Sequence, residues 1–225
     1  MEHLFRRLTT ILGNSMAIKL FDSDSWDEIT RQQDSLSDAD FLKTFQPTLE
    51  MFTLRSSLLM DYAKRLTEIY LLNDLKILEP ASGCNIFPAN LSRLANCQVI
   101  GLEVHSSPAA RYCRIQKLPI ISPPNWSTWT KEIFDLVVVI SYITKPDHNE
   151  WARQVTSDFC KNVLYQIRNG AELVLFDVRY ADPLINVIHN QKLPIEWKNY
   201  PAPGLGGLIF YRKGKPSPRR VEAPE

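Results

Sequence analysis

The stretch from Leu75 to Glu103, LKILEPASGCNIFPANLSRLANCQVIGLE, constrains the fold more than any other part of the chain. A short apolar run ends at Glu79, and a turn of small residues follows it at positions 80–85. A segment of helix length then leads to a second apolar run at 98–102, which is closed by the second acid, Glu103. This order of strand, tight turn, helix, strand and acid is typical of a doubly wound parallel sheet, which holds a nucleoside at the carboxyl ends of its first two strands.

The rest of the chain continues the alternation of strands and helices. Residues 134–140 (FDLVVVI) are apolar and mostly β-branched, which predicts a central parallel strand covered on both faces. Residues 151–167 are expected to form a helix that Gly170 ends. The loop between the runs at 195–200 and 208–212 is too short for a crossover, so these two strands should be antiparallel. Strands are predicted at 75–78, 98–102, 118–121, 134–140, 171–178, 195–200 and 208–212, and helices at 85–95, 108–116, 151–167 and 184–191.

The first 73 residues are expected to be helical and to form a cap. Ser37 and the acids after it give a helix-start signal before an apolar pair. Residues 51–72 carry apolar side chains at helical spacing with no glycine or proline, which predicts one uninterrupted helix. We therefore predict a helical cap at 1–73, an α/β domain at 74–213 and a disordered tail at 214–225.

Composition and charge narrow the class of protein. A chain of 225 residues with 44% apolar content suits one substantial core. The net charge of +1 gives no general attraction to nucleic acids or anionic membranes. No apolar run approaches the ~20 residues that span a bilayer, and no two of the four cysteines have the C-x-x-C spacing of a zinc site or redox pair. We expect a cytoplasmic protein with reduced cysteines, no metal site and no membrane partner.

Over about residues 70–213 the order of elements resembles that of class I S-adenosylmethionine-dependent methyltransferases. That family has an acid followed by glycines at alternate positions, and the matching positions here are Glu79, Ala81, Gly83 and Asn85. A second acid, which in the family binds both ribose hydroxyls, matches Glu103. The resemblance implies a mostly parallel, doubly wound α/β sheet of seven strands with the last one antiparallel, and S-adenosylmethionine as the cofactor.

The resemblance also assigns roles to the loops after the third and fourth strands. The family contacts the adenine from the first of these loops, where Ser122 and Trp126 lie, although Trp126 could equally anchor the loop. Ser141 and Tyr142 match the floor of the cofactor pocket, and Tyr142 is a candidate to orient the methyl acceptor. His148 is a candidate general base, the alternative being an ordinary surface histidine.

The acceptor is less constrained than the cofactor. After the fourth strand the chain lacks the Asn/Asp-Pro-Pro-aromatic box of DNA adenine enzymes, and it lacks the paired acids of metal-dependent catechol-type enzymes. We therefore predict a methyltransferase with an unidentified acceptor, a small molecule being favoured. One alternative is a non-catalytic scaffold or regulatory partner of another protein, which Ala81 and Asn85 at glycine positions favour. Another is RNA methylation, with nucleic acid bound through the basic tail after Arg212.

Overall fold

The structure is a computed structural model that describes residues 23–54, 56–140, 150–176, 181–200 and 207–214. The chain divides into two compact units, Met1–Arg55 and Ser56–Glu225. The helices of the first unit are α3 (Ser23–Gln32), the short 3-10 helix η1 (Gln33–Ser35) and α4 (Asp38–Leu54).

The helix-start signal at Ser37 is confirmed. The Ser37 hydroxyl accepts a hydrogen bond from the Asp40 N–H (3.2 Å) and donates one to the Asp40 carboxylate (2.6 Å), so it caps the first turn of α4. The run predicted as one helix over 51–72 is helical on both sides of residue 55, which lies outside the described residues. Within that run, α4 reaches Leu54, and α5 extends from Ser56 to Ile69. The helix α5 belongs to the same compact unit as the sheet. The predicted domains at 1–73, 74–213 and 214–225 stay predictions.

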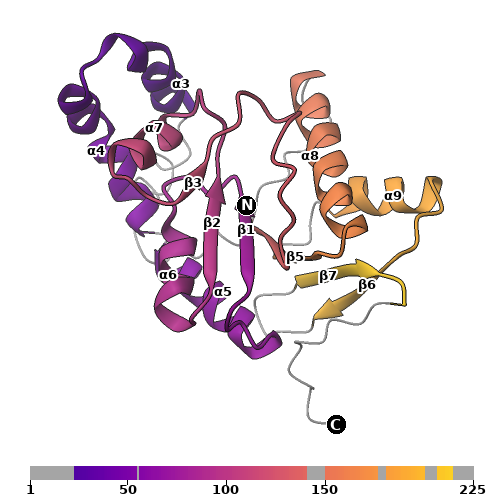
Figure 1. Cartoon of the computed structure of the whole chain (residues 1–225). Coiled ribbons are helices and arrows are strands. Elements are labelled where there is room, and N and C mark those ends of the chain that lie inside the picture. Colours follow the sequence, from indigo (N-terminus) through magenta and orange to yellow (C-terminus); the bar gives the residue numbers. More distant parts are fainter. Residues whose placement is uncertain (1–22, 55, 141–149, 177–180, 201–206, 215–225) are drawn as a thin grey trace, which may run out of the picture. The chain divides into compact units, whose positions relative to one another are not determined.

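The second unit is built on a seven-stranded sheet in the order β3-β2-β1-β4-β5-β7-β6 (Figure 1). The first five strands are parallel to their neighbours, and β7 lies between β5 and β6, antiparallel to both. The predicted α/β fold, with seven strands and an antiparallel last strand, is therefore confirmed. The strands are β1 (Lys76–Pro80), β2 (Gln98–Leu102), β3 (Ile120–Ile121), β4 (Leu136–Ile140), β5 (Glu172–Phe176), β6 (Ile195–Tyr200) and β7 (Gly207–Arg212). The helices are α5 (Ser56–Ile69), α6 (Ile86–Leu94), α7 (Pro108–Ile115), α8 (Glu150–Arg168) and α9 (Asp182–Asn190).

Successive side chains of the strands point to opposite faces and build two hydrophobic layers. Leu78 and Val137 face the layer that holds residues of α8 and α9. Ile77 and Val138 face the other layer, with residues of α5 and α6. Figure 1 shows these two pairs of helices on opposite sides of the sheet. Strands covered on both faces are uniformly apolar, which is why the run at 134–140 was readable from the sequence.

The strand predicted from Phe134 starts two residues later. The Phe134 N–H donates to the side-chain oxygen of Gln166 on α8 (3.3 Å) rather than to a neighbouring strand. Gln166 is buried, and its amide nitrogen donates to the Glu132 carbonyl (2.8 Å). A buried side chain of α8 therefore takes over the backbone pairing just before β4.

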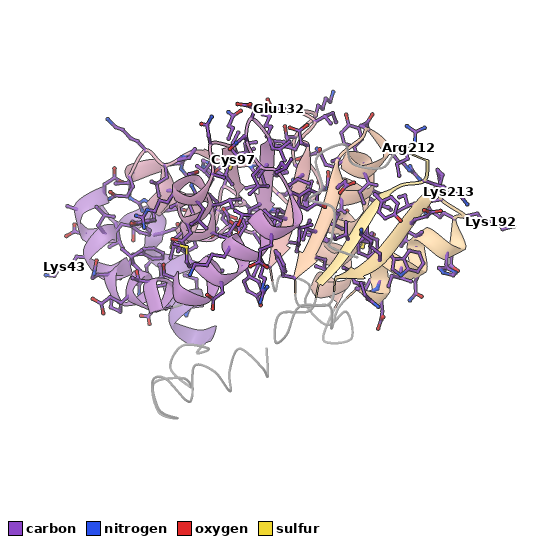
Figure 2. The ribbon with its side chains drawn as sticks, turned by 90° about the horizontal axis from the view of Figure 1, so that it is seen from below. Lys43, Cys97, Glu132, Lys192, Arg212 and Lys213 are labelled. Carbon is purple, nitrogen blue, oxygen red and sulfur yellow. The ribbon has the colours of Figure 1, made fainter. Side chains whose placement is uncertain are left out.

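The amino ends of the parallel strands form the edge of the sheet away from the candidate site. Figure 2 labels Cys97 just before β2, Glu132 four residues before β4, and Arg212 at the end of the antiparallel β7. Glu132 forms an ion pair with Lys76, the first residue of β1. All four cysteines are free. Among the described helices, none combines the length and the apolar character needed to cross a membrane.

Candidate functional site

The carboxyl ends of β1 and β2 bring two acids to one place. Glu79 pairs with Gly101 across the two parallel strands, and Glu103 follows Gly101 by two residues. Because side chains alternate along a strand, Glu79 and Glu103 extend from the same face of the sheet. Both are nearly removed from solvent, with 5% and 8% of their surface exposed. The predicted pair of strand-end acids thus lies together, buried, at the topological position where doubly wound sheets bind their ligands.

Glu103 connects the end of β2 to the turn after β1. One carboxylate oxygen accepts a hydrogen bond from the Gly83 N–H (3.1 Å), and the other accepts one from the Val104 N–H (3.2 Å). The Ser107 side chain adds a third hydrogen bond. These bonds favour the charged carboxylate, but burial outweighs them and raises the pKa of Glu103 to about 7. The acid therefore orders the turn from the neighbouring strand.

The turn itself keeps the backbone shape of an alternating glycine motif. Ala81, Gly83 and Asn85 all have positive φ angles, of 57°, 55° and 63°. Only glycine adopts this left-handed region without steric cost, although asparagine tolerates it better than most residues. The three motif positions predicted from the sequence therefore share one conformation even though two of them are not glycine.

The side chain of Asn85 is held against the sheet. Its amide nitrogen donates to the Pro119 carbonyl just before β3 (3.1 Å). A Cβ atom built on Gly101 would lie 2.2 Å from the Asn85 side-chain oxygen and 2.4 Å from the Ser82 hydroxyl. The Ser82 N–H donates to the Leu102 carbonyl (3.2 Å), which fixes the turn on the same strand. The turn therefore rests directly on β2, and only a glycine at position 101 leaves it room.

Glu79 differs from Glu103 in its hydrogen bonding. Burial, and then the charge of Glu103, raise its pKa well above the ordinary value. One of its carboxyl oxygens makes no hydrogen bond within the described structure. The same holds for three other buried side-chain oxygens at the ends of these strands: those of Ser82, Asn85 and Ser122. Unpaired buried polar atoms are unfavourable, so this edge offers hydrogen-bonding groups that a polar ligand could satisfy.

Two thiols border the turn on its α7 side. The Cys113 thiol donates to the Gly83 carbonyl (3.5 Å), and Cys84 is the next residue of the turn. Burial raises the pKa of Cys113 to about 12 and raises that of Cys84 as well. Both thiols are therefore neutral at physiological pH, which suits a packing role rather than nucleophilic chemistry.

The loop after β3 places the predicted adenine-contacting residues. Trp126 is partly buried, packs against the core on the α8 side, and its carbonyl accepts a hydrogen bond from Asn162 (3.0 Å). Trp129 is buried edge-on against Phe159, with ring centroids 5.4 Å apart. Trp129 is therefore a core anchor, whereas the contacts of Ser122 and Trp126 with an adenine stay predictions.

The remaining predicted residues, Ser141, Tyr142 and His148, lie outside the described part of the chain. Other residues of the site were not anticipated from the sequence: Ser82, Gly101, Ser107 and Cys113. A glycine inside a strand indicates a close approach of another segment, so Gly101 carried a readable signal. Within the described segments no group of three or more histidine, cysteine or acidic side chains could hold a metal ion.

No protein-family model matches the chain, and no curated protein matches it in sequence. Solved structures match it in fold. The pyocyanin biosynthetic protein PhzM is 12% identical with a TM-score of 0.54, over 95% of this chain and 74% of its own. LaPhzM is 10% identical with a TM-score of 0.55, over 88% and 72%. A protein of Nostoc punctiforme assigned as an O-methyltransferase is 12% identical with a TM-score of 0.50, over 75% of this chain. This chain spans only 59% of the Nostoc protein. The chain therefore has the methyltransferase-type α/β fold.

Proposed function

We propose that the protein binds S-adenosylmethionine at the carboxyl ends of β1, β2 and β3 and transfers its methyl group to a small molecule. The observation that carries the proposal is the hydrogen bond from the Gly83 N–H to Glu103, which joins the acid that ends β2 to a turn of positive φ angles. In a doubly wound sheet this is where a nucleoside is held. A cytoplasmic location is part of the same proposal.

The residues present fit the cofactor. The Glu103 carboxylate accepts one backbone hydrogen bond at each oxygen and a third from the Ser107 side chain, which leaves one of its about four acceptor sites open to a ribose hydroxyl. The second ribose hydroxyl would replace Ser107 as a donor. The unpaired hydroxyl of Ser122 is available to an adenine. Trp126, four residues further along the chain, has a flat ring on which an adenine could stack. We assign the turn around Gly83 to the methionine part of the cofactor.

Methyl transfer from this cofactor requires few catalytic groups from the protein. S-adenosylmethionine supplies an activated methyl group, so the chain has to align the acceptor with it and exclude water. We assign the acceptor side to Tyr142, for orientation, and to His148, as the base that takes the acceptor proton.

A non-catalytic module of the same fold is the second candidate. It is favoured because the protein's own groups hold the turn. Asn85 donates to the Pro119 carbonyl, Cys113 donates to the Gly83 carbonyl, and Glu103 accepts from Gly83. A turn ordered in this way requires no ligand. The two candidates differ in one respect, because only the enzyme must bind the cofactor.

Titration calorimetry with S-adenosylmethionine and S-adenosylhomocysteine separates them. Glu103→Ala should weaken binding by about 1–3 kcal/mol, or about 5- to 150-fold, because ligand hydroxyls would lose their partner. Glu196→Ala is the matched control, since Glu196 is an exposed acid on β6 that pairs only loosely with Lys213 (3.6 Å). A folded protein that binds neither compound would refute the methyltransferase and leave the non-catalytic module.

A further inference from the structure

We propose that, without ligand, the Glu79–Glu103 pair carries a single negative charge on Glu103, and that a positively charged cofactor displaces the remaining proton from Glu79. This inference rests on the proposed function and deepens it. If it holds, the site selects a positively charged ligand, and binding of the cofactor releases a proton.

The geometry places two acids in one buried environment. Glu79 and Glu103 lie at the ends of neighbouring parallel strands, two residues apart in register, and the charge of Glu103 acts on Glu79. Two like charges that are both removed from water are strongly unfavourable. Without compensation, at least one of the two acids is therefore protonated at neutral pH.

Hydrogen-bond donors decide which acid holds the charge. Glu103 receives the N–H groups of Gly83 and Val104, together with a hydrogen bond from Ser107. Such bonds stabilise a carboxylate. Glu79 has an oxygen without any partner in the described structure, and burial raises its pKa well above the ordinary value. The proton is therefore assigned to Glu79.

Within the described segments, no protein group compensates for a second charge. The titratable side chains that act on the pair from the turn and from α7 are the thiols of Cys84 and Cys113, and both stay neutral because burial raises their pKa values. No lysine, arginine or histidine in the described segments forms an ion pair with either acid. We therefore assign the positive charge opposite Glu79 to the ligand.

The exchange balances. The O–H bond of Glu79 breaks, its proton passes to the buffer, and the cofactor, which carries a net charge of +1 at neutral pH, replaces it. By linkage, when a site must lose one proton on binding, its affinity for the ligand rises about tenfold for each unit of increase in pH. This holds as long as the pH stays below the pKa of the group that loses the proton. Binding should therefore tighten as the pH rises.

Calorimetry in phosphate and in Tris at pH 8 measures the proton directly, because these buffers differ in their enthalpy of ionisation. The wild-type protein should release about one proton per S-adenosylmethionine bound. Glu79→Gln keeps the shape of the protonated acid and should bind with no proton release. Glu172→Gln is the matched control. It removes a buried carboxylate at the start of β5, which accepts a hydrogen bond from Tyr70, and should release the same proton as the wild type.

Two results would overturn the inference while leaving the proposed function intact. One is wild-type binding without proton release, and the other is a Glu79→Gln protein that still releases the proton. If Glu79→Gln does not fold, the pH dependence of wild-type affinity decides, since a flat profile between pH 7 and 8.5 contradicts the exchange. Failure of the folded wild-type protein to bind the cofactor refutes the proposed function, and this inference falls with it.

Discussion

Replacing Gly101 with alanine tests how the turn is seated on β2. The new Cβ would lie 2.2 Å from the Asn85 side-chain oxygen, 2.4 Å from the Ser82 hydroxyl and 2.8 Å from the Ser82 Cβ. Contacts this short require the turn to move, and overpacking of this kind costs about 1–3 kcal/mol. For a protein of this size, a loss of about 2 kcal/mol lowers the melting temperature by about 4–8 °C.

The assay is thermal unfolding, followed by circular dichroism, of the wild type and four variants. Gly207→Ala is the matched control, because the Cβ added to this strand glycine meets nothing closer than 3.3 Å. It should change stability by less than about 1 kcal/mol. Ser82→Gly, alone and with Gly101→Ala, completes a double-mutant cycle. Removing Ser82 relieves two of the three contacts, so the coupling should be favourable by about 1 kcal/mol.

Two results would refute this seating of the turn. One is a Gly101→Ala protein as stable as Gly207→Ala. The other is a cycle in which the effects of Gly101→Ala and Ser82→Gly simply add. Either result would mean that the turn does not rest on β2 as closely as the contact distances require.

Three further predictions concern other contacts. Ala81→Gly should raise stability by up to about 1 kcal/mol in thermal unfolding, because relief of the left-handed strain at φ 57° exceeds the added chain entropy; a loss of stability would contradict the strain. Tyr70→Phe should destabilise by about 1.5–3 kcal/mol in urea unfolding, because the buried hydroxyl donates to Glu172 at 2.6 Å; a change below about 0.5 kcal/mol would contradict this hydrogen bond. Glu103 has a folded-state pKa raised from the ordinary 4.5 to about 7, so the folded state binds its proton more tightly and its contribution to stability should fall as pH rises through that window. Glu103→Gln should remove this slope from melting temperatures measured between pH 4.5 and 7.5, and an unchanged slope would show that other groups cause it.

The sheet was predictable because its strands carry strong, local signals. The run at 134–140 is apolar enough to indicate a strand covered on both faces, and the bounds of β2 and β6 agree with the prediction. The short third strand was read too long, because Leu118 turns back to donate to the Cys113 carbonyl before β3 begins.

The two acids of the candidate site were predictable from the sequence, but the residues that hold the acids and the turn in place were not. Glu79 and Glu103 follow strands, and parallel strands bring their ends together. The hydrogen bond from Gly83 to Glu103 was not readable, because it depends on how the turn folds back over β2. Ser82 acts through contacts with a strand distant in sequence, which no spacing rule reveals, whereas Gly101 carried the signal of a glycine inside a strand.

A crystal structure of the protein with S-adenosylhomocysteine tests the central claim most directly. The account predicts both ribose hydroxyls within hydrogen-bonding distance of the Glu103 carboxylate, with the backbone of Gly83 against the ligand. A ligand bound elsewhere, or one whose ribose makes no contact with Glu103, would contradict it.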